Sequence, residues 1–201
     1  MAVRIPAMRI TGGIAKGQHL KVPKNRLVRP TTERTREAIF SMLASLTTNW
    51  SCGLDLFAGS GALGIEALSR NAEWVDFVDQ EHRCCAIIKQ NLDKIGFSGR
   101  AHVYCCSVSK ALTFLANKYD VIFADPPYAD TSLNHLLVQL ASSTIIGDES
   151  LVVVSHSSRL PLQNNYDGLI LVKERRYGDT RITIFEKRVA ENRGFSANEG
   201  G

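Results

Sequence analysis

The sequence predicts an α/β fold built on a doubly wound, mostly parallel sheet of seven strands. From residue 53 to residue 155, short apolar segments alternate with segments of helical periodicity, and the apolar segments are too continuous for strands with one exposed face. A glycine-rich loop follows the first of these segments, at the position where such sheets bind ligands. After residue 168 the pattern changes to two β-like segments around Tyr177-Gly178-Asp179, which predict an antiparallel hairpin at the sheet edge.

The size and composition of the chain fit one globular domain without a membrane anchor. It has 201 residues, of which 44% are hydrophobic and 22% are charged. No apolar run approaches the roughly 18 residues needed to span a bilayer. Residues 1–9 lack the apolar core of a signal peptide. We therefore expect a cytoplasmic protein.

The cysteines predict free thiols and no metal site. The chain has five of them, namely Cys52, the pair Cys84-Cys85 and the pair Cys105-Cys106. An odd number with two vicinal pairs argues against a disulfide framework. Adjacent side chains also diverge on a strand or a helix, whereas a structural zinc site needs ligands that converge.

The N-terminal region is expected to form a small basic hairpin and then a helix. Residues 8–11 and 19–22 are β-like, with glycines between them. Residues 29–32 (Arg-Pro-Thr-Thr) are typical of a helix start, with a threonine as N-cap and Glu33 in the first turn. An apolar stripe at helical spacing follows, formed by Ile39, Met42, Leu43 and Leu46.

The doubly wound region supplies alternating strands and helices, and the C-terminal region supplies two more strands. We expect strands at 53–57, 74–78, 101–105, 121–124 and 150–155, and helices at 62–70, 80–95, 110–117 and 133–140. The edge hairpin is expected at 169–173 and 181–185. These elements divide the chain into a basic N-terminal extension (1–30), a main domain (31–188) and a tail that we expect to be disordered (189–201).

Basic residues are concentrated toward the N-terminus. Residues 1–50 contain nine Lys or Arg and two acids, a net charge of +7. The other residues contain 15 basic and 18 acidic side chains, a net charge of −3. A basic segment on a mildly acidic body favours a polyanionic partner, but it also fits a solvated arm, and charge alone leaves both interpretations open.

The glycine-rich loop predicts a cofactor that contains adenosine. It runs over residues 55–64 and has glycines at 59, 61 and 64, which permit a sharp turn and close approach to a ligand. Asp79 lies 20 positions after Gly59, where a carboxylate accepts hydrogen bonds from ribose hydroxyls. These features fit both a nicotinamide dinucleotide and S-adenosyl-L-methionine. A carboxylate at Asp55 disfavours a pyrophosphate and suits the positive ammonium and sulfonium groups of S-adenosyl-L-methionine, which we expect as the cofactor.

Asp125-Pro126-Pro127-Tyr128 follows an apolar strand and predicts methylation of an exocyclic amine of a nucleic-acid base. The lone pair of such an amine is delocalised into the ring, so the amine is a poor nucleophile. A carboxylate at Asp125 and the carbonyl of Pro126 would accept its two N–H groups and direct the lone pair at the methyl group. The prolines stiffen the loop and lack N–H donors, and Tyr128 offers a ring on which the base stacks.

Several segments of the chain resemble the bacterial 16S ribosomal RNA (guanine-N2)-methyltransferases of the small subunit. The segments are 8–13, 29–37, 55–70, 125–128 and 176–180. The Asp-Pro-Pro-Tyr loop is shared with several amine methyltransferases, whereas the Arg-Pro-Thr-Thr-x-Arg-x-Arg-Glu pattern at 29–37 looks particular to this family. The resemblance implies a Rossmann-like class I methyltransferase that uses S-adenosyl-L-methionine and grips RNA with its N-terminal hairpin.

The resemblance also implies roles for individual residues. The target guanine would be held by Asp125, Pro126, Pro127 and Tyr128. The cofactor would be held by Asp55, Phe57, Ala58, Gly59, Ser60, Gly61, Asp79, Gln80, Cys106 and Ser107. RNA would be contacted by Arg9, Lys16, Arg29, Thr31, Thr32, Arg34 and Arg36. For the arginines of this segment, ion pairs with Glu33 and Glu37 are the alternative interpretation.

Two positions depart from the family pattern. Cys106-Ser107 stands where the family usually has an acid that meets the adenine amino group, so Ser107 or backbone groups would read the adenine instead. Ser155-His156 stands where an acidic residue is expected at a strand end. We interpret His156 as a surface or loop histidine rather than a catalytic one.

Three other functions stay open at this point. A DNA methyltransferase of the adenine-N6 type would share the Asp-Pro-Pro-Tyr loop, although the chain is short of a separate domain for reading duplex sequence. A non-catalytic RNA-binding or ribosome assembly factor would keep the fold without needing the intact aspartates. A nicotinamide oxidoreductase would fit the glycine-rich loop. For the leading function we expect a monomer whose partner is small-subunit ribosomal RNA or the assembling small subunit, with no membrane and no metal.

Overall fold

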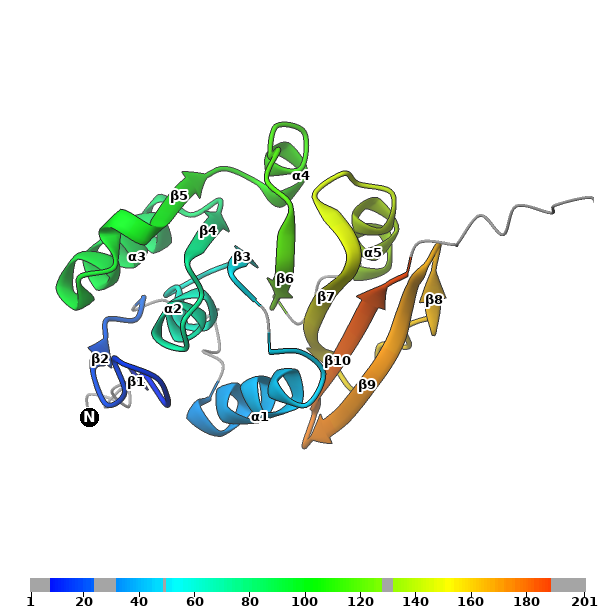
Figure 1. Cartoon of the computed structure of the whole chain (residues 1–201), viewed down its shortest axis with the longest axis horizontal. Coiled ribbons are helices and arrows are strands. Elements are labelled where there is room, and N and C mark those ends of the chain that lie inside the picture. The colour runs from blue at the N-terminus through cyan, green and yellow to red at the C-terminus, as the bar shows by residue number, and fades with distance from the viewer. Residues whose placement is uncertain (1–7, 24–31, 49, 128–131, 189–201) are drawn as a thin grey trace, which may run out of the picture.

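An eight-stranded sheet forms the centre of the molecule, in the order β5-β4-β3-β6-β7-β10-β9-β8 (Figure 1). The computed structural model describes residues 8–23, 32–48, 50–127 and 132–188. Neighbours from β5 to β7 are parallel, and β7, β10, β9 and β8 pair antiparallel, so the predicted α/β fold with a mostly parallel sheet is confirmed. The seven predicted strands are present, and the two-residue β8 is added at the edge. The strands are β3 (Cys52–Leu56), β4 (Trp74–Asp79), β5 (Ala101–Cys105), β6 (Tyr119–Ala124), β7 (Ile146–Ser157), β8 (Asn165–Tyr166), β9 (Leu169–Tyr177) and β10 (Thr180–Lys187).

Helices cover both faces of the sheet. Three of them pack on one face, where Phe40, Leu68 and Ile88 join a hydrophobic core, and two pack on the other face, where Ala111 and Leu137 join a second core. The first group is α1 (Glu33–Ala44), α2 (Ala62–Ser69) and α3 (His82–Ile95), and the second is α4 (Val108–Ala111) and α5 (Leu133–Ala141), with a 3-10 turn (Ser98–Arg100) between α3 and β5. In Figure 1, α1 lies below the sheet while α4 and α5 lie above it.

The strand order reverses between β3 and β6, which places the ligand-binding edge. β3 leads into α2 on one face of the sheet, whereas β6 leads toward α5 on the other face. The segments that follow the two strands therefore diverge at their carboxyl ends, where such sheets bind ligands. Gly64 lets α2 lie close to the sheet, because a Cβ atom there would stand 2.3 Å from the ring of Phe77. The third glycine of the loop therefore serves helix packing.

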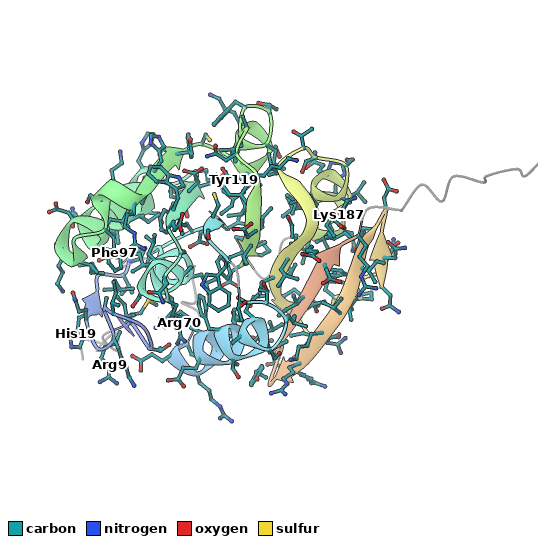
Figure 2. The ribbon with its side chains drawn as sticks, in the orientation of Figure 1. Arg9, His19, Arg70, Phe97, Tyr119 and Lys187 are labelled. Atoms are coloured by element: carbon teal, nitrogen blue, oxygen red, sulfur yellow. The ribbon has the colours of Figure 1, made fainter. Side chains whose placement is uncertain are left out.

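The N-terminal hairpin is anchored on the main domain. β1 (Met8–Arg9) pairs with β2 (His19–Leu20) over two residues each. Glu66 of α2 is wholly buried and accepts hydrogen bonds from the backbone N–H of Thr11 (2.9 Å), from its hydroxyl (2.7 Å) and from Arg70 Nε (3.0 Å). Figure 2 shows Arg9 and His19 on the hairpin and Arg70 beside α1. The hairpin is thus part of the folded body and not a solvated arm.

A buried asparagine joins this hairpin to the glycine-rich loop. Asn91 of α3 accepts a hydrogen bond from the N–H of Lys21 (2.8 Å) and donates to the Lys21 carbonyl (3.0 Å). Its amide also donates to the carbonyl of Ser60 (3.0 Å). One side chain therefore fixes the chain after β2 against the loop between β3 and α2.

Several elements differ from the sequence predictions. β9 extends four residues past the predicted 169–173, and β1 and β2 are shorter than the predicted segments 8–11 and 19–22. The helix expected over 110–117 ends at Ala111, because Thr113 donates its hydroxyl to the carbonyl of Lys110 and the following N–H groups bond in tighter turns. Leu46 lies beyond the end of α1 and is 38% exposed. β7 is longer than predicted at both ends, because Ile146 pairs with Tyr119 at the start of β6 and because His156 and Ser157 pair with β10 beyond the point where β6 ends. Within the described residues, no helix has the length and apolar character to cross a membrane.

Candidate active site

A pocket opens at the carboxyl ends of β3, β4 and β6. Its walls are the glycine-rich loop, the start of α3 and the loop after β6, and Met8 and Pro23 of the N-terminal segment close one side. Among the residues predicted for the site, those lining it are Asp55, Phe57, Ala58, Gly59, Ser60, Asp79, Gln80, Asp125, Pro126 and Pro127. The tertiary structure therefore brings segments about 70 residues apart in the sequence to one place.

The glycine-rich loop is held by the carboxylates that flank it. The N–H of Gly59 donates to Asp79 Oδ2 (2.7 Å), and the N–H of Gly64 donates to Asp55 Oδ2 (2.9 Å). Gly59 and Gly61 have φ of 57° and 77°, and Phe57 has φ of 59°, which is rare for a residue with a side chain. For a bulky side chain such a conformation is unfavourable, and the hydrogen bonds of the loop hold it in place.

Four carboxylates make the pocket electronegative, namely that of Glu81 and those of three aspartates predicted for the site. Asp55, Asp79 and Asp125 all line it, and among the described lining residues there is no Lys or Arg. Burial raises the pKa of Asp55 well above the 3.8 of an exposed aspartate, the hydrogen bond from Gly64 opposes this, and the charges of Asp125 and Asp79 raise it further. Burial likewise raises the pKa of Asp79. A cationic ligand would relieve this repulsion, whereas a phosphate would add to it.

Asp79 uses both carboxylate oxygens to shape the wall of the pocket. Oδ2 accepts from Gly59, and Oδ1 accepts from the N–H of Glu81 (2.8 Å). Glu81 is exposed and also lines the pocket, so a second carboxylate lies two residues further along the chain. The sequence pattern singled out Asp79 and missed Glu81.

The loop after β6 carries the residues predicted to hold the target base. Asp125, Pro126 and Pro127 line the pocket directly after the strand. Asp125 follows β6, and Asp55 lies near the end of the neighbouring strand β3. The negative charge of Asp125 raises the pKa of Asp55. Tyr128 lies outside the described residues.

Three predicted cofactor residues do not line the pocket. Gly61 caps α2 behind the loop, where a Cβ atom would meet Ile88 at 3.2 Å. The hydroxyl of Ser107 caps α4 by accepting from the N–H of Lys110 (3.3 Å), and Cys106 lies next to it outside the lining. Val108, the next residue, lines the pocket instead.

The residues predicted to contact RNA fall into different environments. Arg36 is 0% exposed, donates to the carbonyl of Arg9 and lies 3.9 Å from Glu66, so the prediction of a phosphate contact at Arg36 is corrected. The ion-pair interpretation fits, with Glu66 as the carboxylate at 3.9 Å. The exposed predicted residues are Arg9, which pairs with Glu33 at 3.3 Å, and Lys16, Thr32 and Arg34. Arg29 and Thr31 lie outside the described residues.

The pocket also contains residues that sequence reasoning missed. Met8 and Pro23, at the two ends of the hairpin, line it, and the hydroxyl of Ser60 lies 3.5 Å from Met8 Sδ. No local pattern could have indicated them, because their position follows from the docking of the hairpin on α2 and α3. Cys84 of α3 lines the pocket as well.

His156 is a buried strand residue, which corrects its interpretation as a surface or loop histidine. It is 4% exposed, and its Nε2 lies 3.0 Å from the hydroxyl of Thr183 on β10. Burial lowers its pKa, so the imidazole is neutral at pH 7. His156 does not line the pocket.

The described cysteines are free thiols. Cys105 Sγ lies 3.3 Å from His82 Nδ1, and burial raises the pKa of Cys84 to about 11. In the part of the chain that the structure describes, no group of three or more His, Cys, Asp or Glu side chains is arranged to hold a metal ion.

Comparison with known proteins gives matches over most of the chain. The model of the family described as "Conserved hypothetical protein 95" matches residues 8–186. YlbH of Bacillus subtilis is 35% identical over 184 residues, which are 90% of this chain and 100% of that protein. Ribosomal RNA small subunit methyltransferase D of Escherichia coli K12 is 37% identical over 150 residues, 73% of each chain.

A solved structure has the same architecture. The Escherichia coli protein yhhF, which carries the description of a methyltransferase, superposes with a TM-score of 0.79 at 29% sequence identity. The superposition covers 92% of this chain and 99% of that one.

Proposed function

The chain belongs to the family described as Conserved hypothetical protein 95, and from that membership we propose that it methylates the exocyclic N2 amine of a guanine in 16S ribosomal RNA. The family resemblance that the sequence motifs indicated is confirmed. Methyl transfer to ribosomal RNA is supported by the name of the Escherichia coli relative. The choice of an exocyclic amine is supported by the Asp-Pro-Pro loop, and the choice of guanine N2 by the resemblance of the motifs.

One observation carries the proposal. Asp125-Pro126-Pro127 lines the same pocket as Asp55 and Asp79, so the acceptors for a target amine lie beside a site suited to an adenosine-containing cation. In a doubly wound sheet this is the position at which ligands bind.

The residues of the pocket fit S-adenosyl-L-methionine. When bound, this cofactor supplies a methyl group that its sulfonium already activates for transfer. Asp55 and the backbone of residues 57–60 would hold its cationic amino-acid part, since the pocket is electronegative there. Asp79 and Glu81 would accept hydrogen bonds from ribose hydroxyls, and Val108 would offer an apolar contact to the adenine.

The loop after β6 would position the target amine. The Asp125 carboxylate and the Pro126 carbonyl would each accept one N–H of the amine, which turns its lone pair toward the methyl group. Because proline lacks an N–H, Pro126 and Pro127 present acceptors without competing donors. Accurate positioning then contributes more than acid–base strength. Tyr128 as a stacking platform stays a prediction.

The proposal is tested by methyl transfer from isotopically labelled S-adenosyl-L-methionine to unmodified small-subunit ribosomal RNA, free or in assembling particles. We expect one labelled guanine, identified as N2-methylguanosine by nuclease digestion and mass spectrometry. Transfer to duplex DNA in preference to RNA would support the adenine-N6 alternative, and no transfer to any RNA would contradict the proposal.

Variants of the acceptor carboxylate separate catalysis from binding. Asp125→Ala should lower methyl transfer by at least about 100-fold, because the amine loses its acceptor. Asp125→Asn keeps an acceptor oxygen but loses the negative charge and adds competing N–H donors, so it should also lower methyl transfer. Affinity for RNA should change little. Asp93→Asn removes an exposed aspartate of α3 and is the matched control, which should retain full activity. A fully active Asp125→Ala enzyme would assign the amine acceptor to another group.

A further inference from the structure

The turn between β9 and β10 carries exposed arginines that the proposed function does not use. Arg175 and Arg176 are exposed near the end of β9, and Arg159 is exposed just after the end of β7. We call these three residues the hairpin-tip surface.

The register of the sheet places this surface at the edge that carries the pocket. Ala124, the residue before Asp125, lies beside Val154 of β7, and β7 continues for three more residues. Ser155 pairs with Ile182 of β10, which pairs in turn with Arg175 of β9. Arg175 therefore lies about one residue beyond the end of β6, level with the start of the Asp-Pro-Pro loop, and Arg176 lies further out.

The lateral separation suits contacts with nucleotides next to the target base. Three strand spacings separate β6 from β9, each of about 4.8 Å, so the hairpin-tip surface lies on the order of 14 Å from the loop after β6. This separation is too large for a contact with the target base itself. It is within reach of the sugar–phosphate backbone of the same RNA strand.

The charges of this surface are available for a ligand. Among the described residues, neither Arg175 nor Arg176 forms an ion pair, although Arg176 Nε donates to the carbonyl of Gly178 (2.8 Å). The nearby Glu174 forms an ion pair with Arg181, with 3.1 Å between Glu174 Oε1 and a guanidinium nitrogen. Its charge therefore balances Arg181 and not Arg175 or Arg176. Asp179 is also exposed in this turn, and among the described residues it forms no ion pair with either arginine, so the three arginines and this one acid leave a net positive charge. Exposed cations contribute little to stability, and an excess of them at a substrate-binding edge is typical of phosphate contacts.

The surface lies on the opposite side of β6 from the N-terminal hairpin. That hairpin packs on α2 and α3, with Thr11 bonded to Glu66 and Lys21 bonded to Asn91. α2 and α3 contact β3, β4 and β5, whereas the hairpin-tip surface lies beyond β7. Basic residues thus flank the pocket on both sides, an arrangement that fits an RNA strand passing across the carboxyl ends of the strands.

We propose that the hairpin-tip surface binds phosphate groups of the RNA substrate, on the side of the target base opposite the N-terminal hairpin. The inference rests on the proposed function, because the RNA is the substrate named there. Phosphate contacts fix the register of a nucleic acid on a protein without reading its sequence. The hairpin tip would therefore help to set which nucleotide reaches the pocket.

The test measures the dissociation constant for in vitro transcribed small-subunit ribosomal RNA as a function of salt concentration. Arg175→Gln/Arg176→Gln should weaken binding and make the slope of log Kd against log salt shallower by about 1.4 to 1.8, the value for two lost phosphate contacts. Arg175→Lys/Arg176→Lys keeps both charges and should keep the wild-type slope. The thermal shift with S-adenosyl-L-methionine should be the same for all variants.

The matched control changes the net charge of the protein by the same amount, but at the amino ends of the parallel strands, away from the pocket. Lys118 is exposed and directly precedes β6, so Lys118→Glu lowers the net charge by two, as the double glutamine variant does. The control should bind RNA as the wild type does. Equal weakening by Lys118→Glu would mean a bulk charge effect and overturn the inference. So would a lysine variant that behaves like the glutamine variant, or a glutamine variant with the wild-type slope. If the wild-type protein neither binds nor methylates the RNA, it is the proposed function that fails.

Discussion

At the scale of single residues, the carboxylates of the pocket both fix the glycine-rich loop and make the pocket electronegative. Asp55 and Asp79 accept backbone N–H groups from Gly64 and Gly59 and thereby fix the glycine-rich loop. The same side chains are buried close to one another, and a buried carboxylate without a cationic partner is unfavourable. The free protein therefore holds an electronegative site that a cation stabilises, which is the electrostatic preference expected of a binding site for a sulfonium cofactor.

The affinity for S-adenosyl-L-methionine is expected to rise with pH across the range in which Asp55 of the free protein ionises. Burial and the neighbouring aspartates raise the pKa of Asp55 above 3.8, so the free protein retains its proton to higher pH, whereas the bound cation favours the ionised form. Binding should therefore release protons. Isothermal titration calorimetry in buffers of different ionisation enthalpy measures their number.

The stability of the free protein should change with pH in the opposite sense. Because the folded-state pKa of Asp55 is above its unfolded value, folding retains a proton, and this contribution is lost as the pH rises from the unfolded value through the folded one. Asp55→Asn should reduce the pH dependence of binding to the part that Asp79 contributes and should lower affinity, while Asp93→Asn should leave both unchanged. Uptake of protons on binding would contradict this account.

At the scale of elements, the N-terminal hairpin is stable only because of what it packs against. Two-residue strands do not hold together alone in water. Buried polar side chains of α2 and α3 anchor this hairpin: Glu66 bonds Thr11, and Asn91 bonds Lys21. Because Met8 and Pro23 line the pocket, the same anchors complete its wall.

Glu66→Ala is expected to destabilise the protein by about 3–5 kcal/mol, because it leaves the buried Arg36 without its carboxylate. For a domain of this size the melting temperature should fall by roughly 6–20 °C. Hydrogen exchange should show the loss of protection first in residues 8–20. Glu73→Ala, at an exposed glutamate, is the control and should change stability by less than about 0.5 kcal/mol. A loss of protection confined to the sheet would rule out this role for Glu66.

At the scale of the whole molecule, a single sheet separates the two hydrophobic cores and carries the pocket at the carboxyl ends of its central strands. The two hydrophobic cores lie on opposite faces of the sheet, and the pocket draws on segments from Met8 to Pro127. A ligand in this pocket therefore contacts parts of the chain that are distant in sequence, and it binds only when the whole domain is folded.

S-adenosyl-L-methionine at 100 times its dissociation constant should stabilise the folded domain by about 2.7 kcal/mol. The expected rise in melting temperature is roughly 5–10 °C. Nicotinamide adenine dinucleotide at the same concentration should give no shift, because the carboxylates of the pocket would repel its pyrophosphate. A differential scanning fluorimetry experiment with both compounds measures this, and a larger shift with the dinucleotide would favour an oxidoreductase.

The sequence by itself determined the elements of the sheet and the core of the site. The alternation of apolar strands and helices, the cap at Thr32 and the order of Asp55, Asp79 and Asp125 along the chain are local or periodic signals, and the structure places them as expected. The tertiary structure decided the rest. Burial of Arg36, the contribution of Met8 to the pocket and the extra length of β7 depend on residues far away in the sequence. Hydrophobic periodicity indicates which side of a segment packs against the rest of the protein. The charge environment of a side chain and the last hydrogen bonds of a strand depend on partners that only the folded chain brings into contact.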